Sequence, residues 1–228
     1  MSRISRSDAA RFHRDGFLRV PGLLEAGEIS ELMRDYLRAV GGEIRLTPAR
    51  GRRTPGTLVQ LGHPSYYIRQ WREHPYMQRA AVLARELMGA DVRFWYDQLL
   101  MKPPGCAATT PWHQDAGYWK GTEADQRGVT CWLALSAAPA DSGCMEFVPG
   151  SHRRGIVEHR PTSGSELNDA IEVVATPAVG TAVAVPLAAG DATFHHCRTL
   201  HFTAGNRSGE PRCAVTLHFA PEDVVRGR

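Results

Sequence analysis

The sequence predicts a mainly β fold, a sandwich or barrel, with supporting helices in the N-terminal part of the chain. Apolar residues recur at helical spacing before residue 90, and from Val92 onward the pattern changes to short strand-like runs broken by Gly, Pro and Asp. The chain has 228 residues, of which 43% are hydrophobic and 22% are charged, an ordinary globular composition. This length suits one full core, so we expect a single domain over residues 1–228, with helical support over 1–91 and a β core over 92–220.

Three helical patterns and one strand-like run occupy the N-terminal part. The helical patterns combine capping residues, apolar positions at helical spacing, and glycines at the C-terminal ends. Their amphipathic stripes suit a scaffold that packs on the β core. The elements expected in chain order are a helix capped by Ser7 or Asp8 that runs through Phe12, a strand over residues 17–20, a helix over 28–40 and a helix over 75–89.

Two polar segments without periodicity are expected to be loops. Residues 153–170 are mostly polar, and residues 45–57 are rich in Pro and Gly. Long loops in a compact fold often close over a site, so we expect both to act as lids. The first loop is also basic, with Arg45, Arg50, Arg52 and Arg53.

The remaining chain consists of short runs that resemble strands. Each run is bounded by Gly, Pro or Asp, and such a series predicts a sandwich or barrel. The expected strands cover residues 92–102, 129–135, 144–148, 171–174, 182–186, 192–196 and 213–219.

Charge and cysteine content argue against several kinds of protein. The formal net charge is only +3, which gives no reason to expect nucleic acid or an anionic membrane as a partner. The five cysteines are odd in number and lack a CxxC spacing, so they fit reduced thiols in a cytoplasm better than a disulfide framework. The N-terminal residues lack an apolar signal-peptide region, and no apolar run approaches ~20 residues. We therefore expect a cytoplasmic protein.

The stretch Trp112-His113-Gln114-Asp115 carries the first functional signal. A His and a carboxylate two residues apart on an extended segment point to the same side and can bind one metal ion together. The pair alone is unspecific, because the chain contains 10 His and 24 acidic residues. Two His and one Asp on one face form the facial triad of non-haem Fe(II) oxygenases. The later histidines that could complete it are His195, His196, His201 and His218.

Four stretches in roughly the last 130 residues carry a combined signal. They are Leu-Leu-Met-Lys102-Pro-Pro, Trp-His113-Gln-Asp115, Phe-Val-Pro149-Gly-Ser-His152, and Leu200-His201-Phe-Thr203-Ala-Gly-Asn206-Arg-Ser208, with Arg212 behind the last. Each is unspecific alone, but together, in this order and spacing, they resemble the phytanoyl-CoA dioxygenase family of Fe(II)/2-oxoglutarate oxygenases. The resemblance implies a double-stranded β-helix, which is a jelly-roll, cupin-like core with flanking α-helices.

The resemblance also selects among the histidines. In the family, the distal His precedes by about ten residues an Arg that begins the next core strand and binds the 2-oxoglutarate carboxylate. His201 and Arg212 match this pattern. His196 and Arg207 have the same spacing, but Arg207 lies in a Gly-Asn-Arg-Ser-Gly turn, where its side chain would face water. The expected metal ligands and catalytic residues are His113, Asp115 and His201.

Further residues are expected around the co-substrate, 2-oxoglutarate. Arg212 suits a carboxylate, because a planar guanidinium can form a two-pronged, charge-assisted bond that a Lys cannot reproduce. By the same resemblance Thr203 would present its hydroxyl to this carboxylate, whereas Lys102 is expected to be structural. The other co-substrate contacts expected are Gln98, Trp132 and Gln114.

The resemblance implies an Fe(II)/2-oxoglutarate-dependent dioxygenase that, with O2, hydroxylates or otherwise oxidises an unactivated C–H bond of a small molecule. Asp115 occupies the ligand position that halogenating family members give to a small residue, so halogenation is not expected. Two other functions stay open: a zinc-dependent hydrolase with the same ligands, and a non-catalytic jelly-roll binding module. The hydrolase would leave Arg212 unexplained, and the intact triad argues against the binding module.

The sequence says less about the substrate. The basic loop over residues 45–57 could meet an anionic or carrier-linked group, although a solvated loop is the default interpretation. Tyr118 and Trp119 follow the metal motif and suit either the substrate wall or the core. The compact size favours a role in bacterial secondary metabolism. The oligomeric state cannot be predicted.

Overall fold

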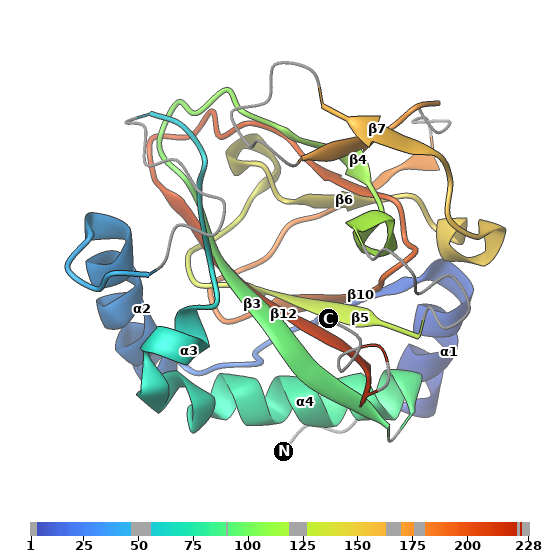
Figure 1. Ribbon diagram of the computed structural model, residues 1–228, viewed down its shortest axis with the longest axis horizontal. Helices are drawn as coiled ribbons and strands as arrows, with labels where there is room; N and C mark the ends of the chain where they lie inside the picture. The colour runs from blue at the N-terminus through green and yellow to red at the C-terminus, as the bar shows by residue number, and fades with distance from the viewer. Residues whose placement is uncertain are drawn as a thin grey trace.

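Two antiparallel sheets form the core of the protein, and helices from the N-terminal part of the chain lie along one of them (Figure 1). This computed structural model describes residues 4–46, 56–89, 91–118, 127–162, 170–175, 181–222 and 224. The larger sheet has six strands in the order β1 (Phe17–Val20), β10 (Ala192–His196), β5 (Val129–Ala134), β12 (Arg212–Pro221), β3 (Val92–Lys102) and β2 (Val59–Gly62).

The smaller sheet lies above the larger one in the view of Figure 1. Together the two sheets form the jelly roll that the sequence predicts, so the expected fold class is confirmed. A separate two-stranded sheet joins β7 (His159–Pro161) to β8 (Ile171–Val173). The four strands of the smaller sheet are, in order, β4 (Thr110–His113), β11 (His201–Thr203), β6 (Met145–Phe147) and β9 (Val183–Val185).

Alternate residues of β12 pack into two different apolar clusters, one on each face of the larger sheet. Cys213, Val215 and Leu217 belong to the apolar core on the helix side of the larger sheet, whereas Ala214 belongs to a smaller apolar cluster that includes residues of both sheets. Because side chains alternate along a strand, Arg212 shares the face of Ala214. All ten residues of β12 are buried. The strand therefore carries a cation into the space between the two sheets.

Capping residues set the ends of the N-terminal helices. The Ser5 side chain caps α1 (Arg6–Asp15) by accepting a 3.0 Å hydrogen bond from the Asp8 N–H, rather than the Ser7 or Asp8 cap that was expected. Reciprocal bonds between Glu25 and Glu28 form a capping box at the start of α2 (Ala26–Gly41). The remaining helices are the short α3 (Pro64–Tyr67) and α4 (Pro75–Met88).

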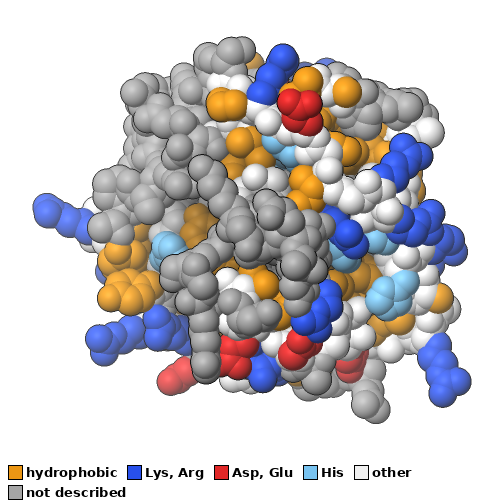
Figure 2. Space-filling model, turned by 45° about the vertical axis from the view of Figure 1, so that its right-hand side comes forward, with side chains coloured by type: hydrophobic (Ala, Val, Ile, Leu, Met, Phe, Trp, Pro, Cys, Tyr) orange, Lys and Arg blue, Asp and Glu red, His pale blue; other side chains and the backbone are white. Residues whose placement is uncertain are grey.

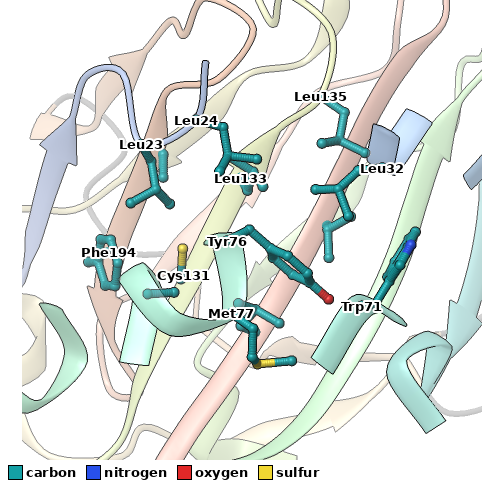
Figure 3. Close-up of a cluster of buried hydrophobic side chains, with 14 of the residues drawn as sticks. Leu23, Leu24, Leu32, Trp71, Tyr76, Met77, Cys131, Leu133, Leu135 and Phe194 are labelled. Atoms are coloured by element: carbon teal, nitrogen blue, oxygen red, sulfur yellow. The ribbon is translucent and has the colours of Figure 1, made fainter. Parts of the chain in front are cut away.

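Helix α4 covers the outer face of the larger sheet. Its Tyr76 ring extends toward Trp71, with the ring centroids 5.9 Å apart, and Tyr76 and Met77 share one buried cluster with residues of β5 and β10, among them Cys131, Leu133 and Phe194 (Figure 3). Burying a large apolar side chain of this kind contributes roughly 1.5–3 kcal/mol. This core fixes β5 and β10, and their opposite faces turn toward the space between the sheets.

Gly16 ties the N-terminal helix to the segment that leads into β11. Its φ of 84° lies in the left-handed region, and a Cβ there would collide with the side chains of His152 and Thr199. The Gly16 carbonyl accepts hydrogen bonds from the His196 N–H at 2.9 Å and the Thr199 hydroxyl at 2.7 Å. Glycine here therefore lets the chain approach the turn that precedes His201.

Most of the expected long elements are present, and the short ones are less accurately placed. Strands β1, β3 and β10 have the predicted bounds, and α2 and α4 end at the predicted glycines. The segment 153–170 was expected to be a loop, but β7 lies within it because its backbone pairs with β8. Of the basic loop, residues 47–55 fall outside the described part of the chain. The division of the single domain at residue 91 stays a prediction. Elements that were not predicted as such are β2, β4, β7, β11 and α3.

No helix in the described residues is long and apolar enough to cross a membrane.

Candidate functional site

Three side chains that could hold a metal ion meet beside the smaller sheet. His113 ends β4 and lies directly opposite His201, the first residue of β11, with their ring centroids 4.1 Å apart. Asp115 Oδ1 lies 3.8 Å from His113 Nε2 and 3.5 Å from His201 Nε2. All three residues are buried, and no other group of at least three His, Cys, Asp or Glu in the described residues comes together in this way.

The local structure around Asp115 differs from expectation. The sequence argument placed His113 and Asp115 on one extended segment, but β4 ends at His113 and Asp115 begins a 3₁₀ turn, η2 (Asp115–Tyr118). The turn brings the carboxylate back toward the two imidazoles. The expected proximity is therefore present, and a change of backbone direction produces it.

Both histidines present the nitrogen that a metal requires. His113 Nδ1 lies 2.8 Å from the Pro111 carbonyl, and His201 Nδ1 lies 2.8 Å from the Thr199 carbonyl. A carbonyl oxygen only accepts, so each Nδ1 is a donor, and each Nε2 faces Asp115 and is the nitrogen left for a metal ion. Burial, reinforced by the neighbouring His201, lowers the pKa of His113 to about 3, which keeps this imidazole neutral.

Asp115 supplies the negative charge of the site. Burial opposes ionisation, but His201 and a hydrogen bond from His195 hold the pKa of Asp115 well below its usual value. Two imidazole nitrogens and one carboxylate form the donor set of a facial triad, so these residues fit a divalent iron ion.

The other histidines occupy supporting positions. His195 and His218 approach the second oxygen of Asp115, with nitrogen to Oδ2 distances of 3.2 and 4.0 Å. His196 lies elsewhere, because its Nδ1 accepts a 3.1 Å bond from the Arg198 N–H and its ring packs 5.3 Å from His152. The geometry therefore supports His201, rather than His196, as the third ligand.

Arg212 is a buried cation with unused donors. Its side chain is 1% exposed and its guanidinium lies 5.2 Å from the centre of the Trp132 ring. Neither Nε nor Nη1 has a hydrogen-bond partner among the described residues. Burial lowers the Arg212 pKa to about 10, a value that still leaves the group charged at neutral pH. Buried donors without a partner are costly, and a carboxylate ligand would accept a charge-assisted hydrogen bond from such a donor.

Lys102 faces Arg212 directly across β3 and β12. Its Nζ donates to Thr203 Oγ1 at 2.7 Å, to the Thr203 carbonyl at 3.2 Å and to the Ala204 carbonyl at 2.5 Å. Burial, with help from the nearby Arg212, lowers the Lys102 pKa to about 7. Lys102 thus anchors the end of β11, in line with the structural role expected for it. The Thr203 hydroxyl accepts from Lys102 and keeps its own proton for donation.

Gln98 and Gln114, which were expected to contact 2-oxoglutarate, have different surroundings. Gln98 lies on the same face of β3 as Lys102 and donates a 2.7 Å bond to the Tyr96 hydroxyl. Gln114 is fully occupied by the backbone: its Nε2 donates to the Gly155 and Arg198 carbonyls, and its Oε1 accepts from the Val157 N–H. These bonds account for the Gln114 amide without a co-substrate.

Aromatic residues after the metal motif lie close to it. The Tyr118 ring packs edge-on to His113 at 5.9 Å, and its hydroxyl accepts a 3.2 Å bond from the Ile171 N–H. Trp119 falls outside the described residues. Tyr118 therefore lies beside the metal site, and its place in a substrate wall stays a prediction.

Sequence reasoning did not identify Thr130. Its hydroxyl donates a 2.5 Å bond to Asp115 Oδ2, and it lies opposite His195 in the pairing of β5 with β10. Alternation along β5 would have placed Thr130 on the same face as Trp132, a residue that was singled out. The signal was therefore present, but the sequence alone does not reveal which strand lies next to β5.

Comparison with known proteins places these features in a family. A family model described as "Phytanoyl-CoA dioxygenase (PhyH)" matches residues 12–214, which span most of the chain. The chain belongs to the phytanoyl-CoA dioxygenase family. Members of this family that it resembles are 2-oxoglutarate-dependent dioxygenases, and the protein is an enzyme of that class, using Fe(II), 2-oxoglutarate and O2.

Two curated relatives match nearly the whole chain. A "Probable alpha-ketoglutarate-dependent hypophosphite dioxygenase" from Stutzerimonas stutzeri is 25% identical over 222 residues, which cover 92% of this chain and 76% of the relative. An "L-proline trans-4-hydroxylase" from Streptomyces griseoviridis is 24% identical over 227 residues, covering 92% and 84%.

Solved structures give the same result. EvdO2 from Micromonospora carbonacea var. aurantiaca matches with a TM-score of 0.82 and 28% identity, covering 96% of this chain and 92% of the other. The epimerase SnoN, solved with Fe3+, alpha ketoglutarate and nogalamycin RO, matches with a TM-score of 0.73 and 31% identity, covering 94% and 82%. The fold and the enzyme class of this phytanoyl-CoA dioxygenase relative thus agree with its site geometry.

Proposed function

We propose that this enzyme hydroxylates an unactivated C–H bond of a small organic molecule. In this proposal His113, Asp115 and His201 hold Fe(II), and Arg212 binds the distal carboxylate of 2-oxoglutarate. The observation that carries it is the pairing of a complete facial triad with a buried guanidinium whose Nε and Nη1 have no partner among the described residues. A zinc hydrolase would use the triad but not this cation.

When bound, Fe(II) with 2-oxoglutarate and O2 supplies an oxidant able to break a C–H bond. The chain's own residues provide the geometry. His113 and His201 keep their Nε2 atoms directed inward through bonds from Nδ1 to backbone carbonyls. Thr203 and Arg212 present donors to a carboxylate, and burial of the whole group excludes water. Asp115 fills the third ligand position, which favours hydroxylation over halogenation.

The substrate is proposed to be a tailoring intermediate of bacterial secondary metabolism. The support is the similarity to SnoN, whose solved complex contains nogalamycin RO. Figure 2 shows a face on which hydrophobic and histidine side chains lie among Lys, Arg, Asp and Glu side chains. We propose that the substrate carries an anionic or carrier-linked group, which the arginines of the basic loop over residues 45–57 would meet. The five cysteines are free and buried, which supports a cytoplasmic location.

The test is release of succinate from 2-oxoglutarate by metal-free protein supplied with Fe(II) and O2. Turnover with Fe(II) but not with Zn(II) is expected for the wild type, and it should increase when the true substrate is added from a panel of metabolites. Hydrolysis supported by Zn(II), without succinate release, would instead establish the hydrolase. Absence of metal binding would leave only a binding module.

A further inference from the structure

The two oxygens of Asp115 have different surroundings. Oδ1 lies 3.8 Å from His113 Nε2 and 3.5 Å from His201 Nε2, so it faces the centre of the triad. Oδ2 lies 2.5 Å from Thr130 Oγ1 and 3.2 Å from His195 Nε2. One oxygen is therefore directed at the metal position, and the other is directed into the larger sheet.

The partners of Oδ2 come from two adjacent strands of the larger sheet. Thr130 on β5 and His195 on β10 are direct cross-strand neighbours and are 2% and 1% exposed. An ionised carboxylate only accepts hydrogen bonds, so the Thr130 hydroxyl and His195 Nε2 must be the donors. The Thr130 oxygen also lies 3.1 Å from His218 Nδ1, which can donate to it in turn. A directed chain of hydrogen bonds from the sheet therefore ends on Oδ2.

We propose that Thr130 and His195 are positioning residues that cap Oδ2, so that Asp115 offers only Oδ1 to the metal. The inference rests on the proposed function in one respect, namely that Fe(II) binds at the triad. A carboxylate that bound through both oxygens would use two of the six coordination positions of an octahedral ion. A capped Oδ2 leaves three positions for the bidentate 2-oxo acid and O2.

The strength of the effect follows from the role of outer partners in metal sites. Loss of a group that orients a ligand typically weakens metal affinity by about 10- to 100-fold. Thr130 and His195 also share the same oxygen, so the removal of either one frees part of Oδ2 to rotate toward the ion. We therefore expect a change in coordination as well as in affinity.

The experiment titrates full-length metal-free protein with Fe(II) without O2, and separately with Co(II), whose absorption spectrum reports coordination. Thr130→Val removes the hydroxyl at nearly constant shape, and His195→Leu removes the second donor. Each is expected to weaken Fe(II) binding by about 10- to 100-fold and to alter the Co(II) spectrum. Thr130→Ser and His195→Gln retain a donor and should stay close to wild type.

Thr193→Val is the matched control, because Thr193 is a buried threonine two residues before His195 on the same strand, and its hydroxyl has no partner among the described residues. It should leave both titrations unchanged. If Thr130→Val does not fold, His195→Leu compared with His195→Gln carries the test alone.

Wild-type affinity and an unchanged Co(II) spectrum in Thr130→Val and His195→Leu would overturn the positioning role while leaving the proposed function intact. Failure of the proposed function looks different: the wild type itself would bind no Fe(II), or would keep its Fe(II) after His201→Ala. Either of those results also removes the basis of the inference.

Discussion

The site has two charged regions: the metal end, formed by His113, Asp115 and His201, and the carboxylate end, formed by Arg212. Their buried charges are compensated in opposite ways. At the metal end, the non-ligating atoms of the triad all have internal partners, including Oδ2 of Asp115. At the carboxylate end, Arg212 is equally buried, but two of its donors have no partner among the described residues. The protein thus completes the first region itself, and in the proposed function an anionic ligand completes the second.

The most severe test of this comparison removes a ligand from the metal end. His201→Ala and Asp115→Ala should abolish stoichiometric Fe(II) binding and succinate release, since two remaining ligands hold an ion poorly. Metal analysis of the purified variants measures the first effect, and a succinate assay measures the second. His196→Ala is the control and should retain iron. The assignment of the third ligand is wrong if His196→Ala loses iron and His201→Ala keeps it.

An intermediate effect is expected at the carboxylate end. Arg212→Lys keeps a cation but loses the planar fork, and a charge-assisted hydrogen bond is worth roughly 1.5–3 kcal/mol. The dissociation constant of 2-oxoglutarate, measured by calorimetry, should rise by about 10- to 200-fold. Iron content should stay the same, because Arg212 is not a ligand.

Arg207→Lys serves as the matched control for this change, because Arg207 is exposed in the neighbouring turn. It should alter neither iron nor co-substrate binding. A weaker 2-oxoglutarate affinity in Arg207→Lys, with a normal affinity in Arg212→Lys, would show that the carboxylate binds elsewhere.

Asp97 is a further buried acidic residue, on the face of β3 opposite to Lys102. It extends the comparison to the stability of the folded protein. Asp97 is fully buried; its Oδ2 accepts a 3.0 Å bond from the Ser65 N–H, and its Oδ1 has no partner among the described residues. Burial raises the Asp97 pKa from 3.8 to about 6. The folded protein therefore holds this proton more tightly than the unfolded chain does, and the free energy of unfolding should fall as pH rises from about 4 to about 6.

Asp97→Asn should remove that part of the pH dependence and raise the free energy of unfolding at neutral pH by an amount on the order of 1–3 kcal/mol. Denaturant titrations of the metal-free protein at several pH values measure it. Asp141→Asn, at an exposed position, should follow the wild type. Equal pH dependence in Asp97→Asn and wild type would mean that Asp97 ionises as freely in the folded protein as in water.

Long elements could be predicted from the sequence because their information is local. Strand β3 is an eleven-residue run rich in aromatic and apolar residues that ends before Pro103, and α4 carries both Pro75 at its start and Gly89 after its end. Strands β4 and β11 span only four and three residues. Such short segments become strands because they pair with each other, a condition set by the fold and not by their own residues.

The same distinction separates the predicted and unpredicted parts of the site. His113 and Asp115 were accessible through motif spacing, and His201 and Arg212 through the family resemblance. The neighbours of Asp115 Oδ2 were not, because they depend on the register that brings Thr130 opposite His195. The occupation of the Gln114 amide by backbone groups was equally inaccessible, since its partners lie on segments distant in the sequence.

The position of His201 directly opposite His113 also affects local unfolding of the smaller sheet. An ion held between these side chains would act as a removable cross-link between β4 and β11, two short strands with few backbone bonds of their own. Chelation should then speed deuterium uptake at the amides of Thr110–His113 and His201–Thr203, while β3 and β12 retain their protection. Iron supply would in this way control the local stability of the smaller sheet. In an iron-deficient cell the enzyme would open more often at β4 and β11, while the larger sheet and its helices stay folded.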